Sequence, residues 1–384
     1  MFRFDSGSLK DLAAELDRWR TQLDYRGPIA RTWAGRLRRD LEAEAVAAST
    51  SMEGIPVTVA EVHRILVGDR PPETREEDAA LVRGYRDAMS FVLRRADDAA
   101  FSWDRELFVG LHDRIMAGNY GDGAGRLRTG PAYVVDNRSS ELVFQPPPPE
   151  DVPRLVDAAC TVMQRGFEHP AIAAAWVHIA IAAIHPFKDG NGRASRVAAS
   201  LAMYRGGFKL PEFTSLEEWW GRHLVEYYAS FACLGKVFDA ESDVTTFLRT
   251  HMEAQLHQIR AFDLRERIQQ KIWIAVEEAV TAAGLEPRVA NAVWDVFFGR
   301  SVTPRYYFSL ADVSSATVTN DLAAAVAAGF LRSEGRARSR RYEAGENLYS
   351  RIGTALGIQV NEGGASARGI IIGELTKRAQ ADGS

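Results

Sequence analysis

The sequence lacks most of the features that mark secreted, membrane-spanning and metal-stabilised proteins. Its two cysteines, Cys160 and Cys233, lie far apart and next to no histidine at metal-ligand spacing, so we expect neither a disulfide nor a zinc site. The N-terminus has no signal-peptide core. The most apolar segment, 171–187, is interrupted by His178 and falls short of the roughly 18 uninterrupted apolar residues of a membrane span. These absences predict a cytoplasmic protein with no membrane segment, in which 171–187 is a buried helix.

A strong excess of either charge is also absent. The formal net charge is −4 over 384 residues and the pI is about 6.1, which gives the whole chain no attraction to nucleic acid or to anionic membranes. Any such partner would have to meet a local basic patch. A hydrophobic fraction of 46% is typical of a globular chain, and the length predicts two or three domains.

Helical periodicity runs through most of the chain and predicts a mainly α fold. It is interrupted by a glycine-rich stretch, 118–130, and by residues 132–144, which have the pattern of two short strands around a turn. The proline run 146–149 must end the second strand, because proline cannot continue a backbone ladder. We therefore expect a single β-hairpin, over residues 128–145, in an otherwise helical core.

The same pattern divides the chain into parts with different composition. These are an N-terminal helical region (1–95), a core that contains the hairpin (96–250), a linking helix (251–270), a small separate domain (271–345) and a tail (346–384). The tail is rich in glycine, alanine and charge from Glu362 onward, and we expect its end to be poorly ordered.

The most informative stretch is HPFKDGNGRASR, His185 to Arg196, which lies between two helical segments. The glycines of 190–192 let successive backbone N–H groups face one side and form a concave anion site. A helix begins directly after them, and a helix N-terminus favours phosphate. Arg193 and Arg196 are three residues apart, hence on one helical face, where both could grip the outer phosphates of a triphosphate.

A carboxylate and a histidine complete this stretch. Asp189, at the mouth of the anion site, would repel phosphate unless a cation lay between them, so it is a candidate Mg²⁺ ligand. The imidazole of His185 can accept a proton from an attacking hydroxyl near neutral pH. No GxxxxGK[ST] occurs, which excludes a P-loop site. A lone histidine or a lone GNG is usually structural, but the ordered combination predicts nucleotide chemistry.

At every defined position, residues 185–196 are similar to HxFx[DE]GNGRxxR, the signature of the Fic (filamentation induced by cAMP) family. The resemblance implies a Fic-type helical core that transfers AMP from ATP to a Ser, Thr or Tyr hydroxyl of a target protein or of itself. It implies that His185 is the catalytic base and that Asp189 holds Mg²⁺, or Mn²⁺ in its place. The nucleotide-binding residues that it implies are Lys188, Asp189, Gly190, Asn191, Gly192, Arg193 and Arg196.

The expected hairpin resembles the flap of the same family. The sequences GRLRTGPAYVVDN and ELVFQPPPPEDVP are similar to flap sequences, and a flap lies over the active site and docks the target segment by strand addition. A hairpin that only packs against the core is the alternative.

Further upstream, Glu53 is predicted to lie at a helix end where a negative charge is unfavourable. Residues 38–54 have the pattern of a helix with a C-terminal glycine cap, which places Glu53 in the last turn, at the negative end of the helix dipole, where it needs a cation. The segment from Ser49 to Gly54 is similar to [ST]xxxE[GN], the inhibitory motif of Fic proteins that carry it N-terminal to the core. The resemblance implies that Glu53 pairs with Arg196 and holds ATP in an unproductive pose. A solvated helix end is the structural alternative.

Residues 271–345 resemble a winged helix-turn-helix domain, which Fic proteins often carry. Ser314 and Ser315 can cap a helix that runs to about Ala328, and two short strands follow, joined by a basic turn. From Phe330 to Tyr342 there are five arginines against one glutamate, which could touch DNA phosphates. The preceding helix offers mostly alanine and valine for base readout, which favours protein docking or support of a homodimer over DNA.

Together these features predict a Mg²⁺-dependent protein adenylyltransferase that Glu53 restrains. Two alternatives stay open. The same glutamate could position water, so that the site removes AMP as a phosphodiesterase, or the protein could be a DNA-binding regulator whose Fic site senses nucleotide. The sequence does not identify the target protein or its modified residue.

Overall fold

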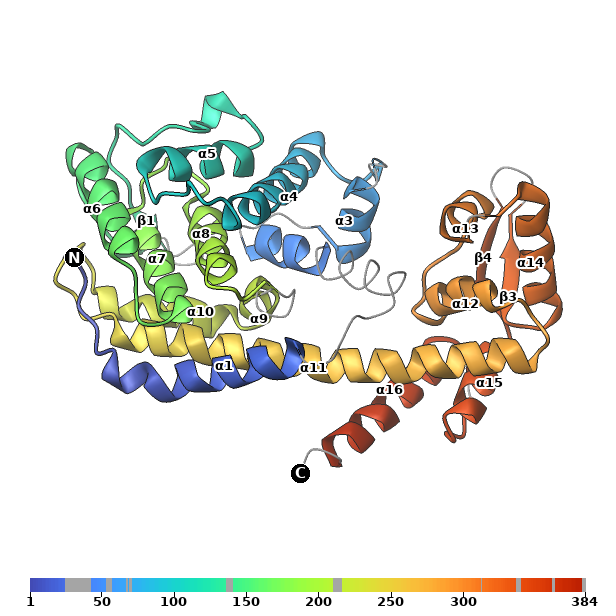
Figure 1. Cartoon of the computed structure of the whole chain (residues 1–384). Helices are drawn as coiled ribbons and strands as arrows, with labels where there is room; N and C mark the ends of the chain where they lie inside the picture. The colour runs from blue at the N-terminus through green and yellow to red at the C-terminus, as the bar shows by residue number, and fades with distance from the viewer. Residues whose placement is uncertain are drawn as a thin grey trace. The chain divides into compact units, whose positions relative to one another are not determined.

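The computed structural model describes residues 1–24, 43–52, 57–66, 68, 71–135, 141–209, 216–311, 313–335, 340–360 and 363–381. The chain divides into two compact units, Met1–Arg260 and Ala261–Ser384 (Figure 1). Both units are mainly helical, and the strands in the described ranges form two antiparallel pairs. The predicted mainly α fold with a β-hairpin is therefore confirmed. None of the helices in these ranges is both long enough and apolar enough to cross a membrane.

The first unit contains most of the helices. Besides a helix over 43–52, they are α1 (Lys10–Asp24), α3 (Val59–Leu66), α4 (Glu76–Ala96), α5 (Arg105–Ile115), α6 (Val152–Arg165), α7 (Pro170–Ile184), α8 (Asn191–Arg205), α9 (Leu216–Arg222), α10 (Leu224–Ser230) and the first part of α11 (Thr245–Ala282). Short 3₁₀ turns lie at Gly7–Leu9, Tyr120–Asp122, Pro149–Asp151 and Phe231–Leu234.

Helices α7 and α8 form the centre of the first unit. Helix α7 begins with Pro170 behind His169, whose Nδ1 accepts a hydrogen bond from the Ala171 N–H at 3.1 Å. It is apolar on every side and buried along nearly its whole length, as expected of a core helix. Helix α8 carries alanine and serine at buried positions, which lets its backbone lie close to α7. The loop between these two helices contains the predicted nucleotide motif.

The hairpin of the first unit is formed by β1 (Val134–Val135) and β2 (Leu142–Phe144). Val134 pairs with Phe144 and Val135 with Leu142 in antiparallel register, and the turn residues 136–140 lie outside the described residues. The residue after β2, Gln145, forms an isolated bridge with Val237, and its N–H donates to the Lys236 carbonyl at 2.9 Å. Two strands alone are marginally stable in water, and this added contact anchors them to the helical core.

The second unit combines helices with a small hairpin. Its elements are the remainder of α11, α12 (Ala290–Phe297), α13 (Pro304–Ala311), α14 (Ser315–Ala327), β3 (Leu331–Glu334), β4 (Arg341–Ala344), α15 (Leu348–Ala355), α16 (Gly364–Ala381) and a 3₁₀ turn at Pro287–Val289. Strands β3 and β4 are antiparallel, and Val302 bridges to Tyr342. Ser314 caps α14, since its Oγ accepts from the Thr317 N–H at 3.2 Å. Within the predicted tail, residues 364–381 form α16, a helix that the sequence pattern did not predict, and the last residues, 382–384, lie outside the described residues.

Candidate active site

The predicted base, His185, lies at the C-terminal end of α7. Its backbone is in the left-handed region, with φ +51°, and its N–H still donates to the Ile181 carbonyl at 3.0 Å. The ring Nδ1 lies 3.3 Å from the Ala182 carbonyl. Because a carbonyl can only accept, this contact places the proton on Nδ1 and leaves the lone pair on Nε2. A neutral imidazole in this tautomer can act as a general base.

The loop after His185 is shaped by Asn191. The side-chain Oδ1 of Asn191 accepts from the Phe187 N–H, and its Nδ2 donates to the Phe187 carbonyl, both at 2.9 Å. Asn191 is 3% exposed and Phe187 is fully buried. The structure therefore places the Asn191 amide in a hydrogen-bonded pair with the loop backbone, which fixes the path from α7 to α8.

His112, on α5, supports the same loop from the other side. Its ring stacks on Phe187 with centroids 3.8 Å apart. Its Nδ1 accepts from the Gly125 N–H at 3.1 Å, so the proton lies on Nε2, which donates to the Asp189 carbonyl at 2.9 Å. Burial lowers the pKa of His112. The neutral ring thus holds Asp189 and the segment near Gly125 together.

Gly190 begins α8 in a conformation that few other residues adopt. Its φ is +74°, and a Cβ there would lie 2.9 Å from the Met116 Sδ and 3.3 Å from the His112 Nε2. The absence of a side chain lets α5 pack against the loop. The first N–H groups of α8 have no partner within the helix ladder, which makes this end an anion site.

Three charged motif residues surround the start of α8. Arg193 is 2% exposed, and its Nη2 lies 3.4 Å from Asp189 Oδ2 and 3.5 Å from Met116 Sδ. The Asp189 side chain is 60% exposed. Lys188 is exposed and lies 3.5 Å from the Asp122 carboxylate. An exposed carboxylate beside a buried guanidinium suits a Mg²⁺ ion that is held by one carboxylate, phosphate oxygens and water.

The described part of this site contains no ready-made metal cage. Among the residues that the structure describes, no three or more His, Cys, Asp or Glu side chains lie in an arrangement that could hold a metal. Asp189 therefore fits a metal that arrives with a nucleotide, because Mg²⁺ commonly binds through one or two carboxylates and substrate phosphates.

Arg196 is buried and contacts the helix over 43–52. Its Nε and Nη2 donate to the Ser49 Oγ at 3.2 and 3.1 Å, and Nη2 also donates to the Ser49 carbonyl at 3.2 Å. Its Nη1 donates to the Tyr227 hydroxyl at 3.4 Å. The structure thus joins Ser49 and Arg196, which are 147 residues apart in the sequence. Glu53 and Gly54, the other predicted inhibitory residues, lie outside the described residues.

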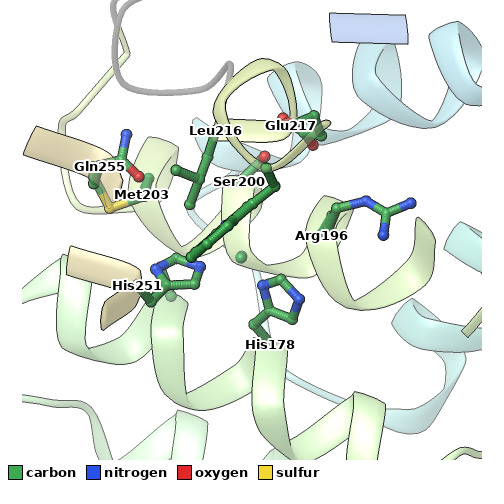
Figure 2. Close-up of a pocket in the computed structure, with 11 residues that line it drawn as sticks. His178, Arg196, Ser200, Met203, Leu216, Glu217, His251 and Gln255 are labelled. Carbon is green, nitrogen blue, oxygen red and sulfur yellow. The ribbon is translucent and has the colours of Figure 1, made fainter. Parts of the chain in front are cut away.

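A small cavity, lined by both polar and apolar side chains, lies behind Arg196 (Figure 2). Its volume is about 10 Å³, close to the space of one water molecule. In Figure 2 the rings of His178 and His251 lie on one side of it and Glu217 on the other. Four buried atoms around it have no hydrogen-bond partner among the described residues: His178 Nδ1, Glu217 Oε2, Trp220 Nε1 and His251 Nε2.

Burial determines the protonation of the groups around this cavity. It lowers the pKa of His178 well below the ordinary histidine value, with further contributions from His251 and the positive charge of Arg196. It lowers the pKa of His251 to about 3. Burial also raises the pKa of Glu217, whose Oε1 accepts from the Tyr85 hydroxyl at 2.6 Å. The two imidazoles are therefore neutral, so they add no positive charge behind Arg196.

Sequence reasoning missed several of these contacts. His112, Tyr227 and Arg128, which binds the carbonyl of His185, lie outside the 185–196 motif. No spacing rule joins them to it, because each acts from another helix or loop. Tyr227 and Trp220 are buried, at 4% and 1% exposure. His178, which interrupts the apolar run of α7 in the sequence, is buried and lies at the cavity behind Arg196.

Comparison with known proteins identifies the family that this site resembles. The family model described as Fic/DOC matches residues 102–203, which include the whole 185–196 motif. The helix over 43–52 and the second unit lie outside that match.

Two relatives bear names that describe an activity. The chain is 29% identical over 130 residues to "Protein adenylyltransferase Fic" of Nematostella vectensis, which is 33% of this chain and 29% of that protein. It is 31% identical over 160 residues to "Protein adenylyltransferase fic-1" of Caenorhabditis elegans, which is 38% of this chain and 27% of that protein. The chain thus spans less than a third of the length of these curated relatives.

Solved structures have the same fold. A Fic family protein from Desulfovibrio desulfuricans G20 matches with a TM-score of 0.57 and 21% identity, over 87% of this chain and 96% of that chain. Fic-1 of Caenorhabditis elegans (residues 134–508) matches with a TM-score of 0.55 and 22% identity, over 68% of this chain and 74% of that chain.

Proposed function

We propose that the protein is a nucleotidyltransferase that moves AMP from ATP to a hydroxyl group of a protein side chain, and the match of residues 102–203 to the Fic/DOC family model supports this. The observation that carries this proposal is the loop between α7 and α8. It places the His185 imidazole, whose Nδ1 faces a carbonyl and whose Nε2 can therefore act as the base, in the same short loop as the anion-binding start of α8.

The reaction that these residues support is a substitution at the α-phosphorus. His185 Nε2 takes the proton of an incoming Ser, Thr or Tyr hydroxyl, and the oxygen forms a bond to the α-phosphorus. The bond from that phosphorus to the oxygen that bridges the α and β phosphates of ATP breaks, and pyrophosphate leaves with that oxygen. The proton stays on His185 until solvent removes it. The protein contributes mainly position and charge, which is the usual way of accelerating phosphate chemistry.

The phosphates would bind at the start of α8. Its N–H groups supply positive charge toward the α and β phosphates, and the guanidinium of Arg193 would hold the outer phosphates together with Arg196. Asp189 would hold Mg²⁺, or Mn²⁺ in its place, which when bound neutralises charge on those phosphates. Lys188 is exposed at the edge of this loop. In the same proposal, the hairpin β1–β2 is the flap on which the target segment docks.

Restraint by Glu53 is the regulatory part of the proposal. Arg196 would grip the outer phosphate, and Glu53 would pair with it and keep ATP unproductive. The contact of Arg196 with Ser49 supports this. Ser49 lies on the helix over 43–52 and precedes Glu53 by four residues in the sequence. The sequence pattern predicts a helix over 38–54, and residues four apart on such a helix share a face, which would favour a pairing of Glu53 with the same guanidinium. Removal of AMP with the same glutamate is the alternative.

Label transfer tests the proposal. ATP labelled at the α-phosphate is incubated with cell extract and wild-type protein, with Glu53→Gly, or with Glu53→Gly combined with His185→Ala. We expect the Glu53→Gly variant to label protein at least about tenfold faster than wild type, and the double variant to lose at least about 100-fold, in line with a general base. Equal labelling by wild type and Glu53→Gly would contradict the restraint, and full labelling without His185 would contradict the mechanism.

A further inference from the structure

Arg128 lies just before the hairpin and donates to four backbone carbonyls. Its Nε donates to His185 O at 2.7 Å, its Nη1 to Gly130 O at 2.9 Å, and its Nη2 to Pro147 O at 2.6 Å and to Ile184 O at 3.4 Å. Arg128 is 7% exposed. We call this guanidinium and its four carbonyls the Arg128 clasp.

The clasp joins two parts of the site. Gly130 precedes β1 and Pro147 follows β2, so these carbonyls belong to the two ends of the hairpin. Ile184 and His185 belong to the end of α7. The backbone N–H of Arg128 adds a bond to the Pro186 carbonyl at 2.9 Å. One side chain therefore ties both ends of the hairpin to the residue that carries the imidazole.

The chemistry of arginine suits this position. The guanidinium is planar and has five N–H donors in a rigid fork, so it can serve several carbonyls at once, whereas the three donors of lysine lie on a single nitrogen. These hydrogen bonds run to neutral carbonyls. Two of those carbonyls, of Ile184 and His185, lie at the negative C-terminal end of the α7 dipole. Burial of a cation is unfavourable, and these charge-assisted bonds offset it.

The hydrogen bond from Arg128 to the His185 carbonyl constrains a residue whose backbone conformation is strained. A non-glycine residue at φ +51° is held there at a cost of about 1–3 kcal/mol, and the surrounding contacts must fix it. The Nε of Arg128 fixes the direction of the His185 carbonyl, and therefore the peptide plane that follows the imidazole. Loss of this bond would let His185 relax while leaving the start of α8 in place, since Asn191 and His112 hold that part of the loop.

We propose that Arg128 is a positioning residue that fixes the His185 imidazole relative to the hairpin, so that a hydroxyl presented by a segment on the hairpin meets Nε2. This inference rests on the proposed nucleotide transfer and adds to it a residue that lies outside the 185–196 motif. Arg128 does not itself contact the predicted phosphate site, so its effect belongs to the rate of transfer and not to ATP binding.

The first test compares Arg128→Lys with Arg205→Lys in the full chain carrying Glu53→Gly. Arg205 is a matched control, because it too donates to helix-end carbonyls, those of Arg95, Ala96 and Asp98, away from the hairpin and the loop. For Arg128→Lys we expect kcat of label transfer to fall about 10- to 100-fold, because small displacements of reacting groups have effects of this size. We expect KM for ATP to change less than about twofold, and Arg205→Lys to keep both constants.

Two further measurements do not depend on activity. Hydrogen exchange of the amides at 134–135 and 142–144 reports the hairpin, and the NMR signal of ¹³C-labelled His185, assigned with His185→Ala, reports the imidazole. We expect Arg128→Lys to accelerate the exchange and shift the His185 signal, and Arg205→Lys to do neither. If Arg128→Lys unfolds, as circular dichroism would reveal, Arg128→Ala with added guanidinium replaces it, and guanidinium should restore both signals.

The outcomes separate the two proposals. An unchanged His185 signal in Arg128→Lys overturns the positioning role, even if hairpin exchange rises. A fall in ATP affinity with unchanged kcat also overturns it. If the Glu53→Gly parent transfers no label to any protein, the proposed function fails, and the exchange and NMR measurements still decide whether the clasp positions His185.

Discussion

Within the loop between α7 and α8, residues proposed to take part in the reaction alternate with residues that only fix the path of the loop. His185 and Asp189 present a base and an exposed carboxylate, whereas Phe187 and Asn191 are buried and bound to each other through backbone and side chain. His112 adds a bond from a different helix. The geometry of the reactive groups therefore depends on residues that have no role in the reaction.

Gly190 allows a direct test of this scaffold. Substitution Gly190→Ala places a Cβ 2.9 Å from the Met116 Sδ at a positive φ, so we expect the free energy of unfolding to fall by about 1–3 kcal/mol. Urea denaturation measures this change. Gly130→Ala is the control, because a Cβ there meets no atom within 4 Å. Equal stability of the two variants would contradict the packing of α5 against the loop.

The buried histidines predict how stability depends on pH. The pKa of His251 falls from 6.5 to about 3 on folding, because burial disfavours the charged ring. The unfolded chain therefore binds this proton near pH 6.5 while the folded chain does not, and its contribution to stability, present above pH 6.5, is lost as pH falls toward 3. We expect His251→Gln to reduce the slope of unfolding free energy against pH by about 1.4 kcal/mol per pH unit between pH 6 and about 4. An unchanged slope in urea titrations would contradict a neutral buried His251.

Among the elements, those with a strong local pattern were predictable from the sequence. The apolar run of α7, the serine cap and the following glycine of α14, and the proline stop after β2 each depend on neighbouring residues. The contact of Arg196 with Ser49 and the Arg128 clasp were not predicted, because they join residues that only tertiary packing brings together. Helix α16 was missed because its glycines weaken the helical signal, while Ile371 and Leu375 pack into the second unit.

The hairpin of the second unit gives a prediction about DNA. Arg332 and Arg341 both form ion pairs with Glu334 and Glu343, so the paired strands carry little net positive charge. We therefore expect wild-type protein to bind a duplex weakly, and Glu334→Gln combined with Glu343→Gln to tighten binding at low salt by releasing two arginines. The slope of log affinity against log salt should steepen by about 2, as measured by fluorescence anisotropy. Tight, steeply salt-dependent binding by wild type would contradict this account. The winged-helix assignment itself stays a prediction.

At the scale of the whole molecule, the match to the Fic/DOC family covers the residues proposed to perform transfer and the hairpin, all of which lie within residues 102–203. The predicted inhibitory residues and the second unit lie outside residues 102–203. Restraint by Glu53 is therefore proposed for a part of the chain that the family match does not include. A net charge of −4 gives the whole chain no general attraction to anionic partners, so any partner must be recognised by local features.

The identity of the transferred group tests the central claim most directly. The Glu53→Gly variant is incubated with extract and with ATP labelled either at the α-phosphate or at the γ-phosphate, and protein-bound label is compared after separation. The account predicts label from the α-position only, together with release of pyrophosphate, and loss of that label when His185→Ala is added. Protein labelled from the γ-position, or from neither position, would contradict it.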